Sequence, residues 1–149
     1  MALLDIMLIN ANPVDVNVAK SLGMKFVDNH FATASRGFDL SLAYTAHADR
    51  GEACFYVFNV GDEGFVIISA DDFFRPVVGY SENGAFDYDN IPPALRDYLD
   101  SIVTGRSRYG ATTYAAPDVA ADWRMLENTG RLVSRNGGRG TDFLVKTQW

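Results

Sequence analysis

The chain of 149 residues is long enough to bury a hydrophobic core without disulfide or metal support, as one domain or one domain plus an extension. Its hydrophobic residues amount to 48% but occur in short segments, all far below the roughly 20 apolar residues of a membrane-spanning helix. The net charge of −6 argues against a general nucleic-acid-binding protein. Composition thus predicts a globular protein with no nucleic-acid partner and, once any leader is removed, no membrane contact.

The charge is unevenly distributed along the chain. Residues 1–103 carry 6 basic and 15 acidic side chains, whereas residues 104–149 carry 7 basic and 4 acidic ones. Residues 1–13 are apolar and end in small residues, but they lack a basic start and include Asp5. They are interpreted as a leader, either the remnant of a secretory signal or an added segment, and are left out of the fold.

The first predicted element is an amphipathic helix that begins near residue 18. Apolar residues recur there with helical period as far as residue 31, and either Asp15 or Asn17 could cap its start. Alternating apolar residues, together with β-branched and aromatic runs, then predict strands. The strands cover residues 38–44, 54–60, 65–70, 76–80 and 85–87, the last two joined by a tight turn at Asn83-Gly84.

A second amphipathic helix is predicted from Ile91-Pro92-Pro93, because proline is tolerated in the first turn of a helix. Its apolar face comprises Ile91, Leu95, Tyr98, Leu99, Ile102 and Val103, and its polar face Arg96, Asp97, Asp100 and Arg106. We expect this helix to lie on the sheet beside the first one. The predicted fold class is α+β: a meandering antiparallel β-sheet of about four to five strands packed against two amphipathic helices, with an extended C-terminal tail.

The chain changes character after Val103. Glycine, serine and threonine make residues 105–113 linker-like, and Pro117 is expected to start a short helix that ends at Gly130. Residues 131–141 are basic, glycine-rich and without periodicity, so we expect them to be exposed and open to proteolysis. The expected cleavage region contains Arg124, Arg131, Arg135, Asn136 and Arg139.

No group of cysteine and histidine residues predicts a catalytic or metal site. Cys54 lies among apolar strand residues, where a free cysteine is typically a small buried hydrophobe. The only histidines, His30 and His47, have no partners at metal-ligand spacing. We therefore expect no enzymatic activity, no metal and no cofactor.

The adjacent carboxylates Asp71 and Asp72 also lack the geometry of a catalytic pair. Neighbouring side chains on a strand or turn point apart, so the two cannot act together as general acid and base. A turn cap, with Arg75 as a candidate ion-pair partner, is the favoured interpretation.

Several segments together resemble the pro-domain of streptopain-family cysteine peptidases. They are Phe55-Tyr56-Val57-Phe58-Asn59, residues 64–71, Gly79-Tyr80-Ser81 with Gly84-Ala85-Phe86-Asp87, Asn90-Ile91-Pro92-Pro93-Ala94-Leu95 and Thr112-Thr113-Tyr114-Ala115. The resemblance covers roughly residues 16–115, and residues 143–149 resemble the opening of that family's catalytic domain. Gln148 precedes Trp149, whereas the family's oxyanion-hole glutamine follows the tryptophan, so that role is not carried over.

The resemblance implies a pro-domain that assists the folding of a cognate cysteine peptidase's catalytic domain and keeps it latent by docking at the active-site cleft. It divides the chain into a leader (1–13), an inhibitory pro-domain (14–115), a linker or activation region (116–142) and the start of a catalytic domain (143–149). The implied location is bacterial, either secreted or at the cell surface or periplasm. Proteolysis in the linker would remove the pro-domain.

The expected inhibitory loop comprises Tyr88, Asp89, Asn90 and Ile91, led by Asn90, because it is short, polar-tipped and pinned between a strand and a proline-started helix. A rigid loop loses little entropy on docking. Alternatively, Asn90 only caps the helix that follows. A stand-alone inhibitor of the same family, a cystatin-like or other ligand-binding module and, with least support, a complete enzyme stay open as other functions.

Overall fold

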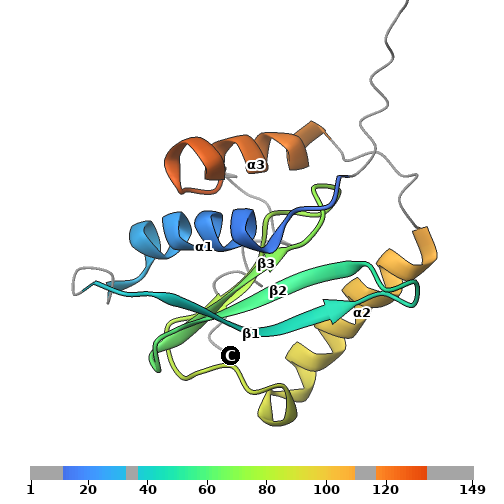
Figure 1. The fold of residues 1–149 in the computed structure, drawn as a ribbon, viewed down its shortest axis with the longest axis horizontal. Helices are drawn as coiled ribbons and strands as arrows, with labels where there is room; N and C mark the ends of the chain where they lie inside the picture. The colour runs from blue at the N-terminus through green and yellow to red at the C-terminus, as the bar shows by residue number, and fades with distance from the viewer. Residues whose placement is uncertain (1–11, 33–36, 110–116, 134–149) are drawn as a thin grey trace, which may run out of the picture.

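The computed structural model describes residues 12–32, 37–109 and 117–133 of the chain (Figure 1). Within these residues one antiparallel sheet has the order β1 (Leu40–His47), β2 (Ala53–Val60), β3 (Gly64–Ser69) and β4 (Val77–Ser81). The helices are α1 (Val16–His30), α2 (Pro93–Tyr109) and α3 (Pro117–Thr129), and the 3-10 turn η2 (Tyr88–Asn90) precedes α2. None of these helices is long and apolar enough to cross a membrane. The predicted α+β class and antiparallel meander are confirmed.

Asp15, one of the two candidate caps, is the N-cap of helix α1. The Asp15 carboxylate accepts a hydrogen bond from the backbone N–H of Asn17 (2.8 Å), which satisfies a free donor of the first turn. The helix ends at Phe31, whose backbone N–H donates to the Val27 carbonyl. The buried residues of the helix are Ala19, Leu22, Gly23, Phe26 and Val27. They form the apolar stripe predicted from the sequence.

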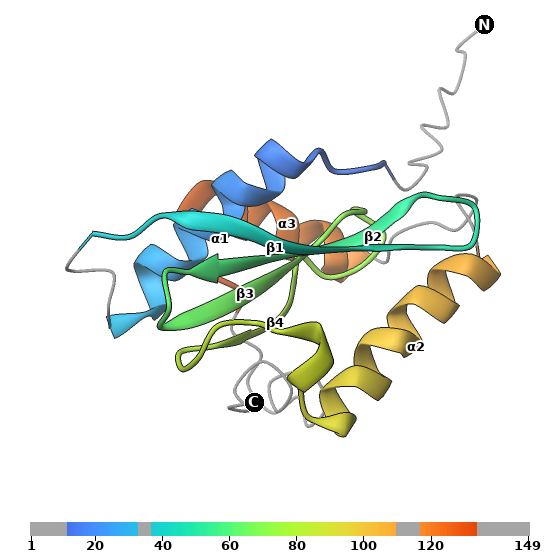
Figure 2. The same ribbon diagram turned by 60° about the horizontal axis from the view of Figure 1, so that its bottom comes forward.

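Strands β2 and β3 are buried on both faces, and this decides where the helices lie. One face contributes Tyr56, Phe58, Val66 and Ile68 to a hydrophobic cluster with α1, and the other contributes Phe55, Val57, Phe65 and Ile67 to a cluster with α2. Helices α1 and α2 therefore cover opposite faces of the sheet, as Figure 2 shows. The predicted side-by-side arrangement is wrong, because strands with apolar residues at every position need cover on both sides.

Helix α2 is longer than predicted. It continues through Gly105 to Tyr109 instead of giving way to a linker after Val103, since one glycine costs a helix only about 1 kcal/mol. Arg106 lies two turns after Leu99, so its side chain follows the apolar stripe and is only 6% exposed. The polar-face position predicted for Arg106 is therefore wrong.

Helix α3 packs against α1 (Figure 1). Leu126 of α3 is fully buried in the α1 cluster, and Trp123 packs against the same cluster. The Lys25 Nζ of α1 donates to the Glu127 carbonyl at 2.7 Å. At Gly130 (φ +70°) a Cβ atom would lie 2.6 Å from the Lys25 carbonyl oxygen, so only glycine allows this approach. Residues 117–129 thus belong to the same packed body as the sheet.

The short strand predicted at residues 85–87 does not form. β4 ends at Ser81, the chain bends at Asn83 and Gly84, and no ladder pairs the residues that follow. The backbone N–H of Phe86 donates instead to the Asn59 side chain (2.8 Å), and the Phe86 ring is buried. The hairpin prediction is wrong, because this side-chain acceptor and the burial of Phe86 replace strand pairing.

Candidate functional site

The predicted loop forms a closed turn between β4 and α2. The Asp87 carboxylate accepts a hydrogen bond from the backbone N–H of Asp89 (3.1 Å), and the Asp87 carbonyl accepts one from the backbone N–H of Asn90 (3.0 Å). The side-chain amide of Asn90 donates to the same carboxylate. Asp87 therefore caps η2 and fixes its conformation.

Side chains from α2 and β1 hold the turn from outside. Arg96 Nη2 donates to the carbonyls of Tyr88 (2.8 Å) and Asp89 (3.2 Å), and its guanidinium carbon lies 5.1 Å from the centroid of the Tyr88 ring. The Tyr88 ring stacks on Tyr44 of β1, with 4.8 Å between centroids and 14° between planes. Helix α2 and strand β1 thus both anchor the turn.

The four predicted loop residues divide into a tip and anchors. Asp89 and Asn90 are exposed, Tyr88 is half-buried, and Ile91 is 9% exposed within the α2 cluster. Asn90 does not cap α2, because its side chain bonds to Asp87 and the helix begins only at Pro93. Asp89 and Asn90 are therefore the exposed tip of the turn.

A hollow of about 190 Å³ adjoins the tip. Its walls are partly apolar and partly polar: Phe65, Asn83, Gly84, Ala85, Asp87, Asn90, Ile91, Pro92 and Leu95. It is smaller than the roughly 300 Å³ from which small-molecule pockets start.

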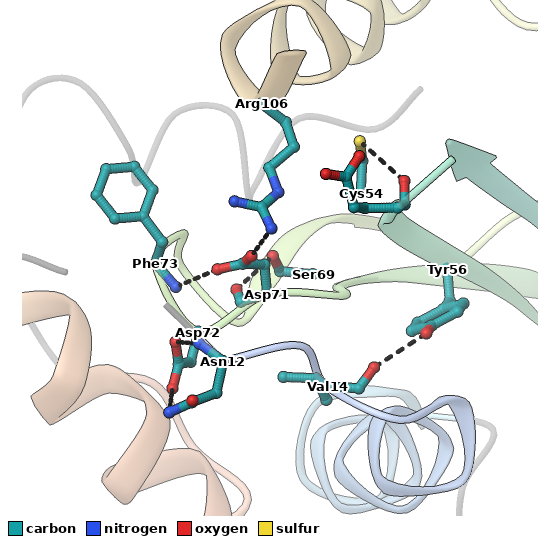
Figure 3. Close-up of polar contacts among 10 residues, drawn as sticks. Asn12, Val14, Cys54, Tyr56, Ser69, Asp71, Asp72, Phe73 and Arg106 are labelled. Atoms are coloured by element: carbon teal, nitrogen blue, oxygen red, sulfur yellow. Dashed lines mark hydrogen bonds and ion pairs between the residues drawn. The ribbon is translucent and has the colours of Figure 1, made fainter. Parts of the chain in front are cut away.

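The corner after β3 contains a buried ion pair (Figure 3). The Asp71 carboxylate is buried, accepts a hydrogen bond from the backbone N–H of Phe73 (2.8 Å) and pairs with Arg106 Nη2 of α2 (2.6 Å). Burial raises the pKa of the Asp71 carboxyl above its ordinary value of 3.8, although the Phe73 N–H and Arg106 oppose the rise. The turn role predicted for Asp71 is confirmed.

Two other residues of the corner, Asp72 and Arg75, bind segments that are distant in the sequence. Asp72 accepts a hydrogen bond from the backbone N–H of Asn12 (2.6 Å), as Figure 3 shows, and its own backbone N–H donates to the Asn12 carbonyl (3.1 Å). Arg75 pairs with Asp118 and Asp122, two carboxylates one turn apart on α3. The predicted pairing of Arg75 with its neighbours in the corner is therefore wrong, because α3 supplies its carboxylates.

Cys54 is a core residue. It is 1% exposed, and burial raises the pKa of its thiol to about 11, so the thiol is protonated at neutral pH. His30 stacks on Phe26 with 4.0 Å between ring centroids, and His47 is exposed at the end of β1. In the described ranges no three or more His, Cys, Asp or Glu side chains are grouped so that they could hold a metal ion.

The expected cleavage region is only partly described. Arg124 lies on α3, and Arg131 follows that helix with its Nε 3.5 Å from the Asn29 Oδ1. Arg135, Asn136 and Arg139 lie outside the described residues, as do residues 143–149.

The sequence prediction missed the anchors of the turn. The sequence predicts Arg96 only as part of the polar face of its helix, and Tyr44 lies in β1, far from the turn along the chain. Arg106, which pairs with Asp71 and does not contact the turn, had a local signal, because it continues the spacing of Leu95 and Leu99. For Tyr44 no local signal existed.

Together, the described residues form a small α+β domain with an exposed turn that is fixed by hydrogen bonds. Over residues 11–104 the chain matches the family described as Spi protease inhibitor. It belongs to that family, the propeptide family of streptopain-type cysteine peptidases, and the predicted resemblance is confirmed.

Two relatives illustrate the family. The thiol protease/hemagglutinin PrtT of Porphyromonas gingivalis is 35% identical over 103 residues, which are 66% of this chain and 12% of PrtT. Streptopain of Streptococcus pyogenes is 36% identical over 63 residues, which are 40% of this chain and 15% of streptopain. The chain thus spans a small part of either relative. A particular likeness to interpain A stays a prediction, and no solved structure matches the chain.

Proposed function

We propose that this chain is the pro-domain of a secreted, papain-like cysteine peptidase of the streptopain type, which it keeps latent by docking at the active-site cleft. In this proposal it also assists the folding of the catalytic domain. The observation that carries the proposal is the exposed Asp89–Asn90 tip on a turn fixed by Asp87 and Arg96. Such a turn has already lost the conformational freedom that docking would otherwise remove.

Charge around the tip supports a partner with a basic surface. Four exposed carboxylates lie on this part of the chain: Asp87, which caps η2, Asp89 in η2, and Asp97 and Asp100 in the first half of α2. Neighbouring charges of one sign raise the rate of association with a surface of opposite charge, and this association rate falls as the salt concentration rises. We therefore propose that the catalytic domain presents basic side chains around its cleft.

The packing of both ends supports a pro-domain that includes Asn12 and extends at least to Leu132, which packs against the α1 cluster. Asn12 bonds to Asp72, and Leu126 is buried against α1, so both ends take part in the fold. Proteases cut extended chain, which disfavours Arg124 within a packed helix. We propose that activating cleavage falls after Leu132, the last residue that packs against the α1 cluster among those described, with Arg135, Asn136 and Arg139 as the candidate positions.

A stand-alone inhibitor is the second candidate, because the family description names a protease inhibitor. It would use the same tip against the same class of enzyme. The gene sequence beyond the Trp149 codon separates the two: a cysteine with a downstream histidine supports the pro-domain, and their absence supports the inhibitor.

Complex formation tests the proposed partner. The chain is mixed with the catalytic domain of a streptopain-type peptidase and separated by size-exclusion chromatography. We expect an equimolar complex whose yield falls as the salt concentration rises. Separate elution of the two proteins at low salt would contradict the proposal.

Asn90→Ala is expected to weaken inhibition about tenfold or more, because central contacts of an interface carry most of its binding energy. The melting temperature should change by no more than about 4 °C, since the lost hydrogen bond is exposed. Inhibition kinetics and thermal unfolding measure the two effects. Asn128→Ala, which removes an exposed asparagine of α3, is the matched control. Equal losses of inhibition and stability would instead assign Asn90 a structural role.

A further inference from the structure

Arg96 makes an unusual set of contacts with the turn. From the first turns of α2, a single nitrogen donates to two consecutive carbonyls, those of Tyr88 (2.8 Å) and Asp89 (3.2 Å). The same guanidinium lies against the Tyr88 ring, 5.1 Å from its centroid. These carbonyls belong to a turn too short to satisfy them through its own helical hydrogen bonds.

The Tyr88 ring extends this contact to the sheet. It stacks on Tyr44, and Tyr44 in turn lies 6.0 Å from Phe86 and 6.3 Å from Phe55, measured between ring centroids. Phe55 and Phe86 are both buried. A rigid path of packed rings therefore leads from the core to the residue that precedes the tip.

We infer that Arg96 is a positioning residue: it sets the orientation in which Asp89 and Asn90 are presented. Its guanidinium supplies a charge and a planar set of donors, which hold two carbonyl groups and rest on a ring at the same time. A lysine keeps the charge but provides only a single mobile ammonium group. The expected effect of Arg96 on inhibition rests on the proposed function. The expected effect of Arg96 on the order of the turn does not.

The test compares Arg96→Lys and Arg96→Met with the unmodified full chain. Amide hydrogen exchange at Asp89 and Asn90 reports the order of the turn, and inhibition of a streptopain-type catalytic domain reports its use. We expect Arg96→Met to speed exchange and to weaken inhibition, each about tenfold, because it removes two charge-assisted hydrogen bonds. Arg96→Lys should show part of both effects and, because its charge is unchanged, should act on the dissociation rate rather than the association rate.

Arg108→Met is the matched control, since it removes an exposed arginine from the same helix. The melting temperature should stay nearly constant in Arg96→Lys and in the control, so that Arg96→Lys remains informative even if Arg96→Met is less stable. Unchanged exchange in both Arg96 variants would overturn the inference. Faster exchange with undiminished inhibition would overturn the role in positioning. If the unmodified chain does not inhibit, the proposed function fails, and exchange alone decides whether Arg96 orders the turn.

Discussion

Arg106→Met is expected to lower the free energy of unfolding by about 3–5 kcal/mol, because it leaves the Asp71 carboxylate buried without its ion-pair partner. Both side chains are almost inaccessible, so water cannot replace the lost contact. Methionine keeps the apolar stem of arginine, which confines the change to the charge. Urea denaturation at neutral pH measures the loss.

The same loss should shrink in acid. Burial raises the pKa of Asp71 above 3.8 in the folded chain, and removing Arg106 takes away one of the contacts that oppose the rise. The folded variant therefore keeps a proton that the unfolded chain has already lost. The loss in the free energy of unfolding is therefore small below about pH 4. It grows as the pH rises and is complete once the pH exceeds the folded-state pKa of Asp71.

Two control variants test whether the loss of stability comes from the ion pair. Arg108→Met on the same helix is exposed and should change stability by no more than about 0.5 kcal/mol. The double variant Asp71→Asn with Arg106→Met should regain part of the loss, because no unpaired charge remains in the core. A double variant no more stable than Arg106→Met alone would contradict the ion-pair explanation.

Leu126→Ala is expected to cost about 2–5 kcal/mol, the range for removing a fully buried leucine from a core. Leu126 belongs to α3 yet packs in the cluster of α1 and the sheet. Thermal or urea unfolding should therefore show one cooperative transition at reduced stability. The neighbouring Met125→Ala, at a position 38% exposed, is the matched control and should have a small effect.

The outcome decides how far the folded unit extends. The family match ends at residue 104, whereas the packed body includes α3 up to Thr129. A loss below about 1 kcal/mol for Leu126→Ala would mean that α3 adds little to the core. A loss in the expected range would show that α3 unfolds together with the sheet.

Local pattern was enough to predict most elements of the fold. The stripe from Ala19 to Val27 has helical period, and the β-branched and aromatic runs gave four strands close to their observed bounds. Two predictions were wrong for different reasons. The continuous apolar runs of β2 and β3 already indicate burial of both faces, and therefore helices on opposite sides of the sheet. The absence of a fifth strand follows from the contact of Phe86 with Asn59, which no local pattern contains.

The position of the candidate loop could likewise be predicted from the sequence. The side-chain contacts that hold the loop in place could not. A short polar segment before Ile91-Pro92-Pro93 marked the turn, since proline starts the next helix. The stacking of Tyr88 on Tyr44 joins residues far apart in the chain, and the contacts of Arg96 depend on the angle at which α2 leaves the turn. Such contacts follow from tertiary packing, which a single sequence does not encode locally.

The most direct test of the central claim is an inhibition titration. The unmodified chain is added in increasing amounts to the catalytic domain of a streptopain-type peptidase, and hydrolysis of a peptide substrate is followed. We predict that the rate falls with the concentration of the chain until the enzyme is silenced, while the chain alone hydrolyses nothing. An unchanged rate at a large molar excess of the chain would contradict the account.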